Sequence, residues 1–338
     1  MPNKLTDEMD FRTPININAG FKLGYADKIL MLGSCFTENI GQKLDDANMN
    51  VVVNPTGILF NPESIAETID KAIEGSPVCE NDVFEHNGLW SNLMFHGRFS
   101  SPDKQDALQR MNEGISLAHK QLMEASVLIL TFGTAYIYRN KADGRVVANC
   151  HKLPANNFER QMLNVQEITD RYTELFERLL AINPKLQIVL TVSPVRHLRD
   201  GAHDNQLSKS TLLLAADQLV QHFSNVHYFP SYEIMMDDLR DYRFYANDMV
   251  HPSDMAVDYI WQQLRENCFS QQDLALMDNI AKIKAAIEHR PLNPNTDEFK
   301  QFITNQLGMV QQLASQHLEV DFSQEISHWE KMAQNAGN

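Results

Sequence analysis

Short apolar runs alternate along the chain with longer segments whose apolar residues recur at helical spacing. The runs are bounded by turn residues and cover residues 28–32, 50–53, 126–132, 187–192 and 226–229. Each is short and apolar enough for a strand that is buried on both faces. Segments 165–182, 207–222 and 254–264 have the amphipathic pattern of helices. This alternation predicts an α/β fold, a three-layer α/β/α domain with a central parallel sheet of about five strands.

Two regions depart from the alternation. The segment 62–124 is longer than one crossover needs and contains several aromatic residues and the pair Asn87-Gly88. It predicts a helix, an irregular insertion around 75–105 and a second helix, and insertions of this kind often face the substrate. Beyond Cys268 apolar residues recur only at helical spacing, with a break at 290–294. We therefore expect one α/β/α domain over residues 1–268 and a helical C-terminal extension over 269–338.

Composition and charge narrow the class of protein. The chain has 338 residues with 44 acidic and 29 basic side chains, a formal net charge of -15. This sign does not suit a protein that grips a phosphate backbone, so no nucleic acid partner is expected. The longest uncharged apolar stretch, 125–138, is shorter than the ~20 residues of a membrane span. The charged first twenty residues predict no secretory signal, and a cytoplasmic location is expected.

No cofactor motif stands out in the sequence. The four cysteines lie far apart, which predicts reduced thiols and no structural metal. Phosphate-binding glycine loops and the His-Glu-x-x-His pattern do not occur. We expect no cofactor, and a small-molecule or carbohydrate ester as the partner that binds the site.

Small residues follow the first predicted strand. Gly33, Ser34 and Cys35 lie where that strand passes into a helix. Parallel sheets bind ligands at the carboxyl ends of their strands, and a helix N-terminus favours an anion such as a thiolate. A plain strand-to-helix turn would use the same small residues, so this motif alone does not decide between the two.

A carboxylate and a histidine stand before the last helix of the predicted domain. Asp248 precedes His251 by three residues on the loop that leads into the segment 254–264. A carboxylate so placed can orient an imidazole and hold its tautomer, as a catalytic triad requires. Taken alone, Asp248 could cap a turn, but two such motifs at opposite ends of an α/β chain can converge above one sheet edge.

With both motifs in place, the chain resembles the SGNH/GDSL hydrolase superfamily, and Gly33-Ser34-Cys35-Phe36 resembles the motif of the GSCFA family. The resemblance implies a flavodoxin-like SGNH fold and assigns Asp248 and His251 to the last block. It nominates Gly57 as an oxyanion donor in the second block. In the first block Cys35 is in register with the nucleophilic serine, while Ser34 lies one position early and stays open. Ala135 stands where the superfamily has its oxyanion asparagine.

Other polar residues near predicted strand ends are candidates for binding an oxyanion or substrate. Those after the third and fourth strands, at 149–151 and 196–197, could replace the missing asparagine. Asn54 could orient the turn that carries Gly57, and His96 could reach the site from the insertion. These candidates are Asn54, Thr134, Asn149, His151, Arg196, His197 and His96.

The resemblance implies acyl transfer through a Cys/Ser-His-Asp triad. The expected activity is that of an esterase or deacetylase acting on an O-acyl substrate, which could be an acetylated carbohydrate. The alternatives are an acyltransferase, which could depend on acyl-coenzyme A, and a non-catalytic protein that binds glycans or acylated ligands on the same scaffold.

Overall fold

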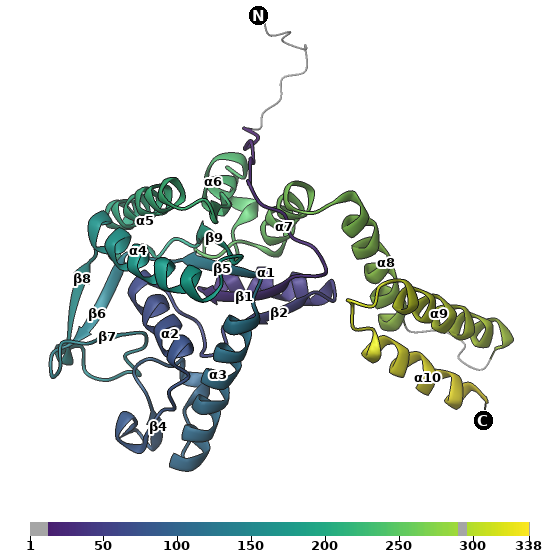
Figure 1. Ribbon diagram of the computed structural model, residues 1–338, viewed down its shortest axis with the longest axis horizontal. Coiled ribbons are helices and arrows are strands. Elements are labelled where there is room, and N and C mark those ends of the chain that lie inside the picture. The colour runs from purple at the N-terminus through teal and green to yellow at the C-terminus, as the bar shows by residue number, and fades with distance from the viewer. Residues whose placement is uncertain (1–12, 290–295, 338) are drawn as a thin grey trace, which may run out of the picture.

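A parallel sheet of five strands forms the centre of the computed structural model, which describes residues 13–289 and 296–337 (Figure 1). The five predicted strands are confirmed, each boundary within one residue. They are β1 (Lys28–Gly33), β2 (Asn50–Val53), β5 (Val127–Phe132), β9 (Gln187–Val192) and β10 (Val226–Tyr228). Their spatial order is β10-β9-β5-β1-β2. This is the flavodoxin-like order, in which the chain reverses direction across the sheet between β1 and β5.

Helices cover both faces of the sheet. Ile29 and Met31 of β1 face α1 (Cys35–Asp46) and α7 (Asp254–Cys268). Leu30 and Leu32 face the opposite layer. That layer comprises α2 (Pro62–Glu74), α3 (Lys104–Glu124), α4 (Val165–Ile182) and α5 (Ala202–His222). Because each strand buries alternate residues on opposite sides, the continuous apolar runs of the sequence are explained.

Two small antiparallel sheets lie outside the central sheet. The insertion contains a hairpin of β3 (Phe84–His86) and β4 (Leu89–Ser91), where the sequence predicts irregular structure. Its turn residues Asn87 and Gly88 both have positive φ, the conformation that favours Asn-Gly in tight hairpins. The second sheet, which the sequence does not predict, has the order β7-β6-β8. Its strands are β6 (Tyr136–Asn140), β7 (Val146–Val147) and β8 (Phe158–Met162).

The C-terminal part is helical in its described residues. It contains α8 (Gln271–Glu288), α9 (Asp297–Gln316) and α10 (Ser323–Gly337). Buried Ile280, Val310 and Trp329 continue the apolar core of the α1 and α7 layer. The helix break predicted at 290–294 lies outside the described residues. Among the helices that the structure describes, none is long and apolar enough to span a bilayer.

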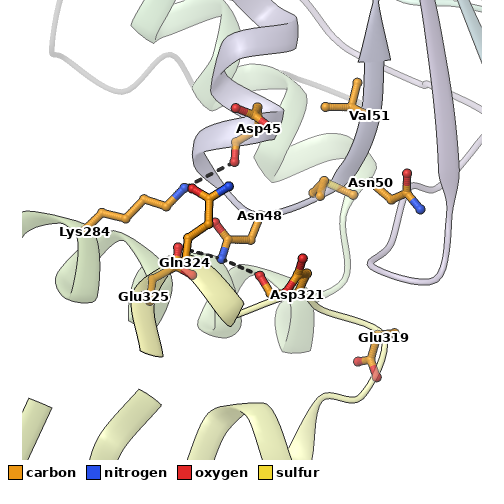
Figure 2. A pocket seen from close by; sticks show the side chains of 10 residues that line it. Asp45, Asn48, Asn50, Val51, Lys284, Glu319, Asp321, Gln324 and Glu325 are labelled. Atoms are coloured by element: carbon orange, nitrogen blue, oxygen red, sulfur yellow. Dashed lines mark hydrogen bonds between the residues drawn. The ribbon is translucent and has the colours of Figure 1, made fainter. Parts of the chain in front are cut away.

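A polar hollow of about 400 Å³ separates α1 and β2 from the C-terminal helices (Figure 2). The Asn48 amide donates to Glu325 at 3.0 Å across it, and Lys284 donates to the Asp45 carbonyl at 3.3 Å. The hollow lies beside the first residue of β2, at the amino end of the strand. It is therefore at the opposite sheet edge from the strand ends that carry the candidate site.

Candidate active site

The first strand end is built around a glycine. Gly33 has a φ of +151°, and a Cβ there would lie 2.5 Å from the Thr131 carbonyl and 2.7 Å from Thr37 Oγ1. Any side chain would collide, so only glycine lets β1 turn into α1. Ser34 is the N-cap of α1 and is fully buried, and Cys35 is the first helical residue.

Ser34 and Cys35 differ in their access to a substrate. The Ser34 hydroxyl is buried and has no hydrogen-bond partner among the described residues. The Cys35 side chain is half-buried, and burial raises the pKa of its thiol. The N–H groups of Phe36 and Cys35 lower that pKa, as does the charge of Lys209. Cys35 is thus the more accessible candidate nucleophile, and it requires a base to become a thiolate at neutral pH.

Asp248 and His251 form a hydrogen-bonded pair. His251 Nδ1 lies 2.6 Å from Asp248 Oδ2, while Asp248 Oδ1 accepts the N–H groups of Val250 at 2.9 Å and His251 at 3.0 Å. These bonds lower the pKa of Asp248 to about 2, with the His251 backbone N–H contributing most. The turn requires a positive φ of 57° at Met249. An ionised carboxylate on Nδ1 leaves Nε2 as the proton-accepting atom of a general base.

Lys209 is a site residue that the sequence reasoning missed. Its side chain is fully buried, and Nζ donates to the carbonyls of Gly133 at 2.7 Å and Ser193 at 2.6 Å. These carbonyls follow β5 and β9, so the ammonium joins two strand ends. Burial lowers the pKa of Lys209 to about 7, helped by the charge of Arg196 and opposed by Cys35.

A signal for Lys209 was present in the helical pattern. The residue lies three positions before Leu212 and seven before Ala216, which are buried on the inner face of α5. A lysine on the apolar stripe of a helix is unusual, because charged side chains are rarely buried without partners.

His197 packs against Phe60, and the charges of Lys209 and His251 act on it. Its ring packs edge-on against Phe60 with centroids 5.7 Å apart, and Nε2 is buried without a partner in the described part of the chain. Burial, together with the charges of Lys209 and His251, lowers the pKa of His197 to about 4. The imidazole is therefore neutral at physiological pH and can donate one hydrogen bond without carrying a charge.

In the loop after β2 the Gly57 N–H and the Asn54 side-chain oxygen are hydrogen-bonded, whereas Asn54 Nδ2 and Thr56 Oγ1 are buried without a partner among the described residues. Asn54, with a φ of 45°, accepts the Gly33 N–H through Oδ1 at 2.9 Å. The Gly57 N–H, which the resemblance nominates for the oxyanion, donates to the Asn54 carbonyl at 2.8 Å. Gly57 also packs against His96, and His96 Nδ1 accepts the Arg98 N–H at 3.3 Å. Gly57 could bind an oxyanion only if the bond to Asn54 broke.

At the end of β5 the backbone N–H groups of residues 133–135 are also hydrogen-bonded within the protein and are not free to bind an oxyanion. Ala135 is fully buried, and its N–H donates to Ser208 Oγ at 2.8 Å. The N–H groups of Gly133 and Thr134 both donate to the Phe60 carbonyl. The Thr134 hydroxyl lies 3.1 Å from Ser208 Oγ. Thr134 therefore contributes a hydroxyl near the site rather than a backbone donor.

The remaining candidates divide between two places. Arg196 Nε donates to Asn205 at 3.1 Å, and its charge acts on Lys209, so it lies at the strand ends. The Asn149 N–H donates to the Leu93 carbonyl at 3.0 Å, and His151 Nε2 lies 2.8 Å from the Asn92 carbonyl. Asn149 and His151 thus use these polar groups to anchor their loop to the insertion.

Comparisons with known proteins show what this chain is similar to. Two solved structures with low similarity are a provisionally assigned platelet activating factor from Streptococcus pneumonia and an acetyl xylan esterase from the rumen bacterium Butyrivibrio proteoclasticus. The first is 12% identical with a TM-score of 0.36, over 71% of this chain and 83% of that chain. The second is 10% identical with a TM-score of 0.34, over 72% of this chain and 64% of that chain.

No curated protein matches the chain. Two family models do match. The model of the GSCFA domain protein, C-terminal domain, matches residues 280–335. The model of the GSCFA family matches residues 28–264, from the first strand of the central sheet to α7. That match spans the motif at Gly33–Phe36 and the Asp248–His251 pair, and the chain belongs to the GSCFA family.

Proposed function

We propose that this protein is an SGNH-like acyl-transfer enzyme, an esterase or deacetylase for O-acyl substrates, with Cys35 as nucleophile. The observation that carries the proposal is the 2.6 Å bond between His251 Nδ1 and Asp248 Oδ2. This bond prepares His251 to act as a general base. The same chain places the half-buried thiol of Cys35 at the N-terminus of α1. Lys209 supports placing these residues in one site, because its charge lowers the pKa of both Cys35 and His197. The charge of His251 also lowers the pKa of His197.

The first step forms a thioester. His251 Nε2 takes the proton of the Cys35 thiol, and the sulfur bonds to the acyl carbon of the ester. The carbonyl oxygen becomes an oxyanion. When that intermediate collapses, the bond from the acyl carbon to the alcohol oxygen breaks, and the alcohol leaves with the proton from His251. Asp248 stabilises the imidazolium that exists between the two proton transfers.

The second step releases the acyl group. Water gives a proton to His251 as its oxygen bonds to the acyl carbon, and the carbon–sulfur bond then breaks. Cys35 recovers its proton, and a carboxylic acid is the product. A sugar or another alcohol in place of water would make the same site an acyltransferase.

His197 replaces the donors that are missing from the oxyanion site. The neutral ring has an unpaired Nε2, whereas Gly57 and Ala135 have their N–H groups in other bonds. A neutral imidazole can polarise a carbonyl without first losing a proton. The Phe36 and Cys35 N–H groups at the start of α1 add backbone donors, and the charge of Lys209 acts on Cys35 beside them. One such donor is worth about 2.7–4 kcal/mol of transition-state stabilisation.

The test is acylation of the intact protein by p-nitrophenyl acetate, followed by quenching and peptide mapping. We expect one acetyl group on Cys35 that neutral hydroxylamine removes, and none in Cys35→Ala. Cys79→Ser is the control for non-specific acylation, because Cys79 is an exposed thiol away from the strand ends. A hydroxylamine-resistant acetyl group on Ser34 would reassign the nucleophile.

A non-catalytic binding protein is the second candidate. The occupied Gly57 N–H and the alanine at position 135 favour it, since both weaken the expected oxyanion site. It predicts no acetyl adduct and no ester turnover, with His251→Gln indistinguishable from the parent.

A further inference from the structure

A groove of about 290 Å³ lies between the antiparallel sheet β7-β6-β8 and the 3-10 turn Leu198–Asp200 that follows β9. Three aromatic rings line it, together with charged and polar side chains from both walls. The aromatic residues are Phe60, Tyr136 and Tyr138, and the charged ones are Arg160, Arg199 and Asp200.

The register of the small sheet creates the aromatic wall. Tyr136 and Tyr138 alternate along β6 with Ile137, which is fully buried on the other side. Arg160 of β8 pairs with Tyr138 across the sheet, so all three side chains share one face. The Arg160 guanidinium lies 3.6 Å from the centre of the Tyr136 ring and 5.9 Å from that of Tyr138. This stacking fixes the plane of the Arg160 guanidinium and leaves the N–H groups at its edge available for hydrogen bonds.

An ion pair joins the two walls. Arg160 Nη2 lies 2.6 Å from Asp200 Oδ2, and the Asp200 side chain is only 15% exposed. The pair leaves Arg199, which is exposed, as the source of the groove's net charge. Together with Asn61 it gives the groove donors and acceptors beside the rings of Phe60 and Tyr138, while Arg160 is stacked on the ring of Tyr136.

The groove reaches the candidate active site at one end. Thr134 and His197 line it, and they follow β5 and β9 at the carboxyl edge of the central sheet. The charge of His251 acts on His197. A ligand in the groove would therefore lie beside the imidazole proposed to bind the oxyanion.

Size and chemistry limit what the groove can hold. A volume of about 290 Å³ is at the low end for ligand pockets, which run from roughly 300 to 1,000 Å³. Aromatic faces suit the C–H faces of a pyranose ring. A planar arginine paired with a carboxylate suits its neighbouring hydroxyls. Because Asp200 balances the charge of Arg160, only the exposed Arg199 leaves the groove with a positive charge, so the groove has no cluster of free cations for a multiply charged anion.

We propose that this groove binds the sugar ring of an O-acylated saccharide and thereby presents the acyl group to the site at Cys35. The proposal rests on the acyl-transfer function proposed above. It specifies that the alcohol part of the ester substrate contains a ring with hydroxyl groups.

Three acetate esters of primary alcohols test the groove. Methyl 6-O-acetyl-β-D-glucopyranoside has a ring with hydroxyls, cyclohexylmethyl acetate has a ring without them, and ethyl acetate has no ring. We expect kcat/KM for the sugar ester to exceed that of both others by about tenfold or more, because a site built for hydrogen bonds rejects analogues that lack them. Equal values, or a preference for the cyclohexyl ester, would overturn the proposal.

Variants of the walls make the test specific. Tyr138→Ala and Arg160→Gln should each lower the ratio of sugar ester to ethyl acetate kcat/KM about tenfold. Tyr138→Phe keeps the ring and should retain most of the ratio. Arg110→Gln makes the same substitution in a more exposed ion pair on α3, with Asp106 at 2.8 Å, and is the control for loss of an arginine charge away from the groove. A ratio that Tyr138→Ala and Arg160→Gln leave at the parent value would mean that the stack only braces the sheet.

Binding without turnover separates the two proposals. Saturation-transfer NMR with methyl β-D-glucopyranoside should show contacts to the parent that Tyr138→Ala loses. If the glucoside binds in this way and no ester is hydrolysed, the groove stands and the acyl-transfer function fails. If esters are hydrolysed and the glucoside shows no contacts, the groove proposal fails and the function stands.

Discussion

Replacing Lys209 by methionine tests the buried charge beneath the strand ends. Methionine has a similar length but no charge and no donor, so the substitution removes the bonds to the Gly133 and Ser193 carbonyls. It also removes the positive charge that lowers the pKa of Cys35. If the ammonium serves catalysis, activity should fall even though the fold survives.

The energetic terms in Lys209→Met oppose each other. Lowering the pKa of Lys209 from 10.5 to about 7 corresponds to a cost of about 5 kcal/mol for keeping it charged in the fold. Methionine removes that cost. It leaves two buried carbonyls unpaired, at about 1–3 kcal/mol each. We therefore expect the unfolding free energy at pH 7 to rise by at most about 3 kcal/mol or to fall by at most about 1 kcal/mol.

The pH dependence has a definite sign. The unfolded chain holds the Lys209 proton up to about pH 10.5, whereas the folded protein loses it near pH 7. The unfolded state therefore binds more protons in this window. The parent should gain about 1–2 kcal/mol of stability between pH 7 and 8.5 relative to Lys209→Met. The groups whose charges act on Lys209, Arg196 and Cys35, remain in both proteins.

Urea denaturation at pH 7, 7.75 and 8.5 measures this difference, and iodoacetamide labelling of Cys35 over the same range measures its thiol pKa. Lys209→Met should raise that pKa and slow labelling at pH 7, while Lys209→Arg, which keeps the charge, should restore part of the rate. The reasoning is refuted if the two proteins have parallel stability profiles and Cys35 reacts equally in both.

Three further predictions concern the neighbouring residues. His251→Gln should lower kcat/KM for p-nitrophenyl acetate by about 10² or more at an unchanged melting temperature, because the side chain is 47% exposed; kinetics and circular dichroism check this. As the pH falls from 6.5 to 4, His197 should cost the fold up to about 3 kcal/mol, because the unfolded chain takes up that proton first. Urea titrations should show His197→Asn losing less stability than the parent over this range, and equal losses would contradict the assignment. Asn54→Ala should destabilise the folded protein by about 2–3 kcal/mol, because it leaves the Gly33 N–H unpaired and puts alanine at the positive φ of position 54. In the same urea assay Asn54→Gly, which tolerates that φ, should cost about 1 kcal/mol less.

The central sheet was predictable because its signal is local. The inner strands β1, β5 and β9 are short, apolar and buried on both faces, so their residues carry the pattern without help from distant parts of the chain. The sheet β7-β6-β8 was not predictable. One strand has only the two residues Val146–Val147, and β8 exposes Glu159 and Arg160 between buried or half-buried neighbours. Such strands are stabilised by their partners rather than by their own composition.

The sequence by itself determined the strands of the central sheet and their order along the chain, the glycine turn before Cys35 and the local pairing of Asp248 with His251. The pairing was visible because three residues on one tight turn keep both side chains within reach. Only the tertiary structure decided which donors are free. The Gly57 and Ala135 N–H groups are bonded elsewhere, while His197 Nε2 is left unpaired. It also decided the place of Lys209, since the carbonyls that hold it lie 76 and 16 residues away in the chain. Hydrogen bonds between distant strand ends depend on packing, which no local pattern of residues contains.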